Sequence, residues 1–186
     1  MATHELHKLP GGYLITFTCY QWISLIEVTN AYDLIYKWYD ILKETGFHIL
    51  GYVIMPNHVH TLIYKGDENL DLNKYVGSGK RFLAYGMVER LKQNNQEYLI
   101  ERLQSGVKAS EKRKGKRHQV FKLSFDGKWI ASREAMENIL DYVHHNPVSG
   151  RWALVDDFAD YQHSSAMFYE CGKEGIYKIT HYGEFY

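Results

Sequence analysis

The chain has 186 residues and a mass of 21.9 kDa, the size of one domain with extensions. Its composition, 45% hydrophobic and 24% charged, is that of a globular protein and excludes disorder or a collagen-like structure as the main state. The two cysteines, Cys19 and Cys171, are too far apart in sequence for a disulfide framework or a C-x-x-C knuckle, which favours a reducing cytoplasm. Residues 1–8 are polar and no run of 18 apolar residues occurs, so we expect neither an export signal nor a membrane partner.

The net charge of zero hides an uneven distribution. Residues 65–130 carry 15 basic and 8 acidic side chains, whereas the flanking segments are acidic. Residues 108–117 hold six Lys or Arg and only Glu111 against them. Such a run is either a solvated, mobile loop or a surface that contacts phosphates. The 15% aromatic content and ten histidines supply groups that stack on bases or bind metals.

A strand and a helix open the pattern of elements. Residues 13–20 are rich in β-branched and aromatic side chains, which is typical of a strand. Thr29 or Asn30 can cap a helix whose apolar residues recur at helical spacing. Gly46 stands where a left-handed residue would end that helix.

A hairpin and a long helical segment follow. Residues 47–55 and 58–64 have strand composition and are joined by Pro56-Asn57, a turn signal. Residues 70–103 are mostly helical in pattern, and we expect a break at the glycines of residues 77–79.

The last elements complete a recognisable order. Residues 120–125 are expected to form a short strand, after which Ser132 caps an amphipathic helix that Pro147 ends. The order βαββαβ builds an antiparallel four-stranded sheet with helices on one face, a ferredoxin-like or RNA-recognition-like α+β fold. We expect a single domain over residues 1–186, with a core at about 13–148 and a tail, 149–186, packed on it.

Two histidines two residues apart form the first candidate site. In a strand, His58 and His60 point to the same face, so two imidazoles can close on one metal ion. Roughly 0.5 H-x-H pairs are expected by chance in a chain with this histidine content, so the spacing alone leaves a purely structural role open.

A tyrosine and an asparagine form the second candidate site. On a helix, Tyr142 and Asn146 lie on the same side, so a phenol and an amide carbonyl can face a common point. Pro147 favours an extended conformation for Asn146 at the helix end, which would free its side chain. The alternative is a tyrosine that packs beside the apolar stripe and an asparagine in an ordinary turn.

Both segments resemble a known family. The string G-Y-V-I-M-P-N-H-V-H-T-L-I at residues 51–63 and the string Y-V-H-H-N-P-V at residues 142–148 resemble the single-tyrosine HUH transposases, in particular the REP-associated tyrosine transposase branch. The likeness runs from about residue 13 to residue 168. It implies an enzyme on a ferredoxin-like sheet that cuts and rejoins single-stranded DNA, typically at a hairpin, with a tyrosine nucleophile and a divalent cation.

The resemblance assigns roles by position. His58 and His60 would be paired ligands of Mg²⁺ or Mn²⁺, Tyr142 the nucleophile and Asn146 the third ligand. Relatives of the wider class carry Gln at the last position, and His145 is a neighbouring competitor for that role. Residues 160–165 match a family segment after the tyrosine helix, which we interpret as docking of the tail.

The chemistry of these residues is consistent as a set. A phenol with a pKa near 10 needs help to attack a phosphodiester at neutral pH. A hard cation held by two imidazoles and one amide oxygen keeps about three octahedral positions for water and phosphate oxygen. The expected products are a 5′-phosphotyrosine and a free 3′-hydroxyl, which can attack back without a nucleotide cofactor.

The basic residues of the middle third are the candidate DNA contacts. We expect these side chains to face DNA phosphates: Lys80, Arg81, Lys112, Arg113, Lys114, Lys116 and Arg117. The partner would be single-stranded or hairpin DNA, bound by a monomer or a homodimer.

Three functions stay open at this point. The first is a DNA strand-transferase that uses Tyr142. The second is a metal-dependent nuclease in which water attacks and Tyr142 only positions the substrate. The third is a non-catalytic single-strand binder on the same fold, which would use aromatic stacking.

Overall fold

The structure is a computed structural model that describes residues 9–186, so residues 1–8, on which the expectation about an export signal partly rests, lie outside the described residues. Its centre is one antiparallel sheet in the order β2-β3-β1-β4. The strands are β1 (Gly11–Thr18), β2 (Phe47–Met55), β3 (His58–Lys65) and β4 (Asp126–Ile130). This order and these directions confirm the ferredoxin-like α+β fold.

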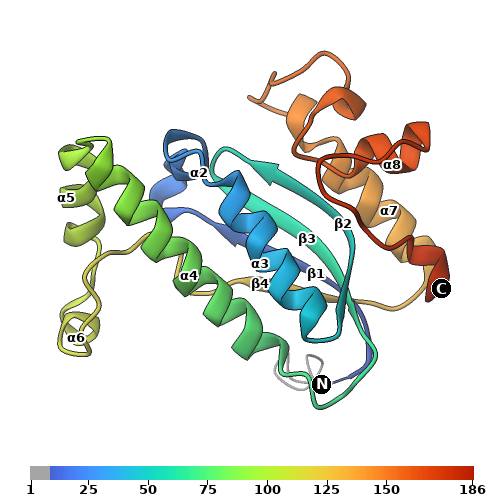
Figure 1. Ribbon diagram of the computed structural model, residues 1–186, viewed down its shortest axis with the longest axis horizontal. Helices are drawn as coiled ribbons and strands as arrows, with labels where there is room; N and C mark the ends of the chain where they lie inside the picture. The colour runs from blue at the N-terminus through green and yellow to red at the C-terminus, as the bar shows by residue number, and fades with distance from the viewer. Residues whose placement is uncertain (1–8) are drawn as a thin grey trace.

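Helices cover both faces of the sheet (Figure 1). The α-helices are α2 (Leu25–Val28), α3 (Tyr32–Glu44), α4 (Leu72–Gln93), α5 (Glu97–Ser105), α6 (Ala109–Lys112), α7 (Arg133–His144) and α8 (Ala166–Cys171). Short 3-10 turns are η1 (Tyr20–Trp22), η2 (Asn146–Val148), η3 (Phe158–Asp160) and η4 (Tyr182–Glu184). Across residues 9–186, no helix is both long and apolar enough to cross a bilayer.

The expectation of helices on one face is therefore incomplete. The helices α3 and α4 pack on one face in a core that includes Val59 and Ile63 of β3, whereas α7 packs on the other face against Leu62. Because side chains alternate along a strand, His58 and His60 share the face of Leu62. The two histidines thus lie on the α7 side of the sheet.

The tail docks along β2. The amide of Ile54 donates to the carbonyl of His163 at 2.8 Å, and the amide of Ser165 donates to the carbonyl of Tyr52 at 2.9 Å. The segment thereby satisfies backbone groups at the edge of the sheet that would otherwise stay unpaired. Docking by residues 160–165, expected from the sequence, is confirmed.

The strand expected at residues 120–125 is wrong. The fourth strand is β4, and the preceding segment contributes only the isolated bridge between Cys19 and Phe121. The Lys80 Nζ atom of α4 donates to the carbonyls of Lys122 and Ser124, at 2.8 and 3.0 Å. A lysine side chain therefore uses the carbonyls that a strand would offer to a neighbouring strand.

The expected caps of the first long helix are also wrong. The N-cap of α3 is Ala31, with no side-chain hydrogen bond, while Asn30 lies in the left-handed region at a φ of 46°. The Thr29 hydroxyl donates back to the carbonyl of Leu25 at 2.6 Å and so serves α2. Gly46, with a φ of 97°, follows α3 as expected.

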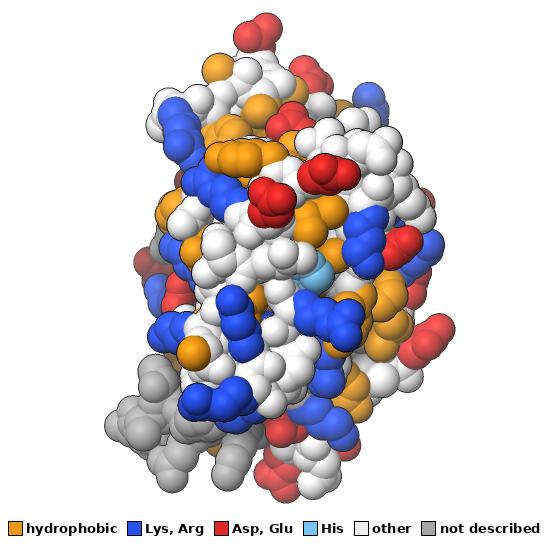
Figure 2. All heavy atoms as spheres, turned by 90° about the vertical axis from the view of Figure 1, so that its left-hand side faces the viewer, with side chains coloured by type: hydrophobic (Ala, Val, Ile, Leu, Met, Phe, Trp, Pro, Cys, Tyr) orange, Lys and Arg blue, Asp and Glu red, His pale blue; other side chains and the backbone are white. Residues whose placement is uncertain are grey.

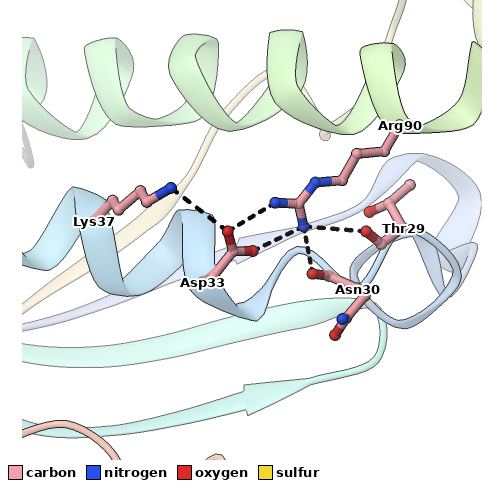
Figure 3. A network of polar contacts seen from close by, with 5 residues as sticks. All are labelled: Thr29, Asn30, Asp33, Lys37 and Arg90. Atoms are coloured by element: carbon pink, nitrogen blue, oxygen red, sulfur yellow. Dashed lines mark hydrogen bonds and ion pairs between the residues drawn. The ribbon is translucent and has the colours of Figure 1, made fainter. Parts of the chain in front are cut away.

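A guanidinium fixes the start of α3 to α4 (Figure 3). Arg90 donates to both carboxylate oxygens of Asp33, at 2.8 and 2.7 Å, and to the carbonyls of Thr29 and Asn30. This bidentate pair holds the pKa of Asp33 below its ordinary value. Arg90 thus ties the segment before α3 and the first turn of α3 to α4.

The helix break expected at residues 77–79 is wrong, because α4 runs through these glycines and ends before Asn95, which has a φ of 52°. Packing explains the glycines. A Cβ atom on Gly79 would lie 2.2 Å from Nε1 of the buried Trp38, and one on Gly86 would lie 2.5 Å from Leu34. Two of the glycines in α4 therefore allow close approach to α3.

This packing predicts opposite effects for two glycines of one helix. Gly79→Ala should lower the free energy of unfolding by about 1–3 kcal/mol, because Trp38 is enclosed and cannot yield. Gly77 has no neighbour within 4 Å of an added Cβ, so Gly77→Ala should raise it by about 0.5–1 kcal/mol through helix propensity alone. Urea unfolding of both variants is the measurement, and equal shifts for the two would contradict the packing argument.

Candidate functional site

A cleft of about 390 Å³ opens on the α7 side of the sheet and is lined by β1, β3 and α7. His58, His60, Tyr142 and Asn146 all line it, so the structure brings together the four residues that the sequence selected. The cleft also contains side chains that the sequence did not single out, chiefly Thr16, Thr18, Trp22, Lys122, Ser124 and Asp126.

The amide of Asn57 fixes the ring of His58. Its oxygen lies 2.7 Å from the Nδ1 atom of His58, and its nitrogen donates to the carbonyl of Trp22 at 2.9 Å. Because the second bond assigns the amide nitrogen, the oxygen must accept and Nδ1 must carry the proton. The neutral ring of His58 therefore has its lone pair on Nε2.

His60 is held in the same way by the neighbouring strand. Its Nδ1 atom lies 2.7 Å from the hydroxyl oxygen of Thr16, its register partner on β1. Burial lowers the pKa of His60 to about 3, with His58 adding to the effect. Burial also lowers the pKa of His58, and Arg151 adds to that shift while Asn146 opposes it. Both imidazoles are thus neutral near pH 7, as metal ligands must be.

Asn146 turns its amide oxygen to the cleft. Its nitrogen donates to the carbonyls of Tyr142 and Val143, at 2.9 and 3.3 Å. These bonds close the end of α7, and Asn146 lies in η2, so the extended conformation expected from Pro147 is wrong. The side-chain oxygen is left to interact with His58.

The donor chemistry fits a small cation. A lone pair on Nε2 of His58 and the amide oxygen of Asn146 are both acceptors, and two acceptors face each other stably when a cation lies between them. His60 offers a second nitrogen in the same cleft. Among residues 9–186, no three His, Cys, Asp or Glu side chains are grouped so that they could hold a metal ion. The amide oxygen of Asn146 is an oxygen donor in the same cleft.

Tyr142 lies on the rim of the cleft. Its side chain is 59% exposed, while Ile139 and Val143 on the same helix are buried against the sheet. The ring centroid lies 5.8 Å from that of His60, with the ring planes at 74°. A phenol on this rim is accessible to a macromolecular substrate and is adjacent to the paired imidazoles.

His145 points elsewhere. Its Nδ1 atom lies 2.9 Å from the carbonyl of Asp141, and its ring packs on Phe158 with centroids 4.0 Å apart. It does not line the cleft. Of the two alternatives for a third ligand, this arrangement favours Asn146.

A larger basic cleft of about 960 Å³ lies beside the first, between α4 and residues 114–123. Its Lys and Arg side chains are Lys80, Arg81, Lys92, Lys114, Lys116, Arg117 and Lys122, with Glu89 as the acidic member. Lys122 lines both clefts, so the two lie next to each other at this side chain. Figure 2 shows Lys and Arg side chains spread over the α5 and α6 side of the molecule.

The seven expected DNA contacts divide into three groups. Arg81, Lys114, Lys116 and Arg117 line the basic cleft, and Lys116 is paired with Glu111 at 2.7 Å. Lys80 also lines it, but its Nζ atom is held by two carbonyls, and burial lowers its pKa to about 8. Lys112 and Arg113 do not line it.

The residues that sequence reasoning missed differ in how they could have been found. Thr16 could have been found from strand pairing, because the register of β1 against β3 places it opposite His60 and on the same face. Trp22 ends the short 3-10 turn η1 and Lys122 lies in a loop, and neither segment has a periodicity that indicates where its side chains point. Their presence in the cleft is a tertiary result.

The hydrogen bonds at His58 predict its tautomer. Long-range ¹⁵N–¹H NMR spectra at neutral pH should show His58 protonated at Nδ1 and unprotonated at Nε2. In Asn57→Ala this preference should be lost, because the acceptor for Nδ1 is removed. An Nε2-protonated ring in the parent protein would contradict the arrangement.

Comparison with solved structures gives two likenesses. A REP-associated tyrosine transposase bound to a REP hairpin superposes with a TM-score of 0.55 and 16% identity, over 84% of this chain and 76% of that chain. A protein of Deinococcus radiodurans R1, provisionally assigned as a transposase, gives a TM-score of 0.45 and 15% identity, over 74% of this chain and 91% of that chain. No family model and no curated protein match the sequence. The chain therefore has the fold of a REP-associated tyrosine transposase.

Proposed function

We propose that the protein is a metal-dependent endonuclease and strand-transferase that acts on single-stranded DNA next to a hairpin, with Tyr142 as nucleophile. The observation that carries this proposal is the shared cleft of His58, His60, Tyr142 and Asn146. Two of these residues come from β3, one from the end of α7 and one from the η2 turn that follows it, about 80 positions later. A protein that only binds nucleic acid does not need neutral paired imidazoles beside an accessible phenol.

The reaction follows from what these side chains offer. The phenol oxygen of Tyr142 attacks phosphorus, and the bond from phosphorus to the 3′ oxygen breaks as the new bond forms. The phenol loses its proton and the departing oxygen gains one, so a 5′-phosphotyrosine and a 3′-hydroxyl result. Because one phosphodiester replaces another, attack by a 3′-hydroxyl on the phosphotyrosine rejoins DNA and releases Tyr142.

His58, His60 and Asn146 would hold Mg²⁺ or Mn²⁺. Such an ion, when bound, polarises the phosphoryl group and stabilises negative charge on its oxygens. The protein supplies the rest: Asn57 and Thr16 hold the two rings with their Nδ1 atoms engaged, and the buried strand β3 keeps the rings neutral. Lys122, on the rim, adds positive charge where a phosphate would lie.

The basic cleft suits the DNA flanking the cleaved bond. It shares Lys122 with the smaller cleft and is lined by seven Lys or Arg side chains, of which Lys80 already donates to two carbonyls. The structural neighbour was solved with a REP hairpin, and we extend a hairpin-bearing substrate to this chain on the basis of the shared fold and this charge.

Tyr142→Phe is the decisive variant. With Mn²⁺ and an oligonucleotide that carries unpaired flanks beside a hairpin, the parent should form a covalent adduct visible on a denaturing gel. Tyr142→Phe should form none, because only the nucleophilic oxygen is lost. Tyr98→Phe is the matched control: Tyr98 is 70% exposed on α5, outside the cleft, and its loss should leave the adduct unchanged.

Other outcomes separate the alternatives. Cleavage by Tyr142→Phe without an adduct would identify a nuclease in which water attacks. A parent that binds the oligonucleotide but never cleaves it would identify a binding protein. Retained cleavage in both His58→Ala and His60→Ala would remove the cation from the proposal.

Salt dependence tests the basic cleft. Each phosphate contact adds about 0.7 to the slope of log affinity against log salt for single strands, so a variant combining Lys114→Ser and Arg117→Ser should lose about 1–2 units of slope. A variant combining Lys112→Ser and Arg113→Ser removes the same charge outside the cleft and should change the slope by less than half as much. Equal losses would show that the basic segment acts through its overall charge.

A further inference from the structure

Trp22 occupies an unusual position at the mouth of the smaller cleft. Its side chain is 50% exposed, although tryptophan is among the largest apolar side chains. Its ring is edge-on to that of His58, with centroids 6.0 Å apart and planes at 78°. One face of the ring is covered by the ammonium of Lys122, 4.2 Å from the centroid.

The backbone beneath this ring is strained. Gln21 and Trp22 are consecutive residues with positive φ, at 51° and 59°. Bulky L-residues avoid this region at a cost of order 1 kcal/mol or more, and Gly or Asn would be favoured there on conformational grounds. The backbone conformation does not favour tryptophan at position 22. The contribution of Trp22 therefore lies in its ring.

The strain is maintained by the same residue that fixes the metal ligand. The amide of Asn57, fully buried, donates to the carbonyl of Trp22 while its oxygen accepts from His58. The amide of Cys19 donates to the carbonyl of Asn57 at 2.8 Å, and the amide of Trp22 donates to the carbonyl of Cys19 at 3.1 Å. Trp22 and His58 are thus held in a fixed relation through one side chain.

We propose that Trp22 is a stacking platform for one unpaired nucleobase beside the cleaved phosphodiester, with Lys122 on the adjacent phosphate. This inference rests on the proposed function, because it places single-stranded DNA in the smaller cleft. An exposed indole stacks on any base, and a base on it would lie next to His58. The ammonium that covers the ring in the free protein belongs to Lys122, which lines both clefts.

Stacking on Trp22 restricts which nucleotides of the substrate can bind there. The nucleotide that stacks must be unpaired, because a base inside a duplex has both faces covered by its neighbours. The rigid link through Asn57 fixes the distance between that base and the site of chemistry. Trp22 would therefore help to select the phosphodiester that is cut, by its position relative to the end of a hairpin stem.

The test uses hairpin oligonucleotides in which 2-aminopurine replaces one unpaired base at a time, with Tyr142→Phe protein and EDTA so that no cleavage occurs. Fluorescence should be strongly quenched at one flanking position. Adding Trp22→Leu should abolish that quenching and weaken binding about tenfold or more. Trp129→Leu is the matched control, since Trp129 is 37% exposed on β4 outside both clefts, and it should change neither reading.

A second variant guards against misfolding. Trp22→Gly removes the ring and suits the positive φ, so it should keep the far-UV circular dichroism spectrum and cooperative unfolding of the parent while losing the quenching. Quenching that survives Trp22→Leu, or binding equal to that of Trp129→Leu, would overturn the platform even if Tyr142 forms its adduct. Quenching that depends on Trp22 in a protein whose parent forms no adduct would support the platform and remove the proposed chemistry.

Discussion

The packing of α7 on the second face of the sheet is the constraint on which the site depends. Its apolar side chains Leu140 and Val143 are buried against the sheet, and the close approach requires Gly51, where an added Cβ would lie 2.6 Å from Leu140. Gly51 stands at the register shift in the pairing of β2 with β3. Once α7 is seated there, one helical turn carries Tyr142 and Asn146 over His60 and His58. Burial of the apolar side chains of α7 thus sets the positions of the polar side chains in the cleft.

The side chains around the two histidines favour the state that the proposed cation site requires. Burial disfavours the charged imidazolium, and the oxygen atoms of Asn57 and Thr16 engage the Nδ1 atoms. Each ring is therefore neutral near pH 7 and fixed in direction. The same side chain of Asn57 donates to the carbonyl of Trp22, so the turn at the mouth of the cleft and His58 are held together by one amide.

Charge acts locally in this protein. The chain is neutral overall, yet the basic cleft has seven Lys or Arg side chains against Glu89. A field of this kind guides a phosphate backbone over the distance of a Debye length, about 10 Å at 0.1 M salt, and the net charge is irrelevant at that range. Lys80 has a structural role instead. Its ammonium donates to the carbonyls of Lys122 and Ser124 and so holds the segment before β4 in place.

By itself, the sequence determined the order of elements, the alternation that puts His58 and His60 on one face, and the helical spacing of Tyr142 and Asn146, because these depend on periods of two and 3.6 residues. The strand predicted at residues 120–125 and the helix break predicted at residues 77–79 were wrong, because in both places a distant side chain is involved. Lys80 donates to two carbonyls of the first segment, and in the second segment Gly79 leaves room for the ring of Trp38. Only the tertiary structure brought Trp22 and Lys122 to the cleft. Loops carry no periodic signal, and their direction is set by long-range hydrogen bonds such as that from Asn57 to Trp22.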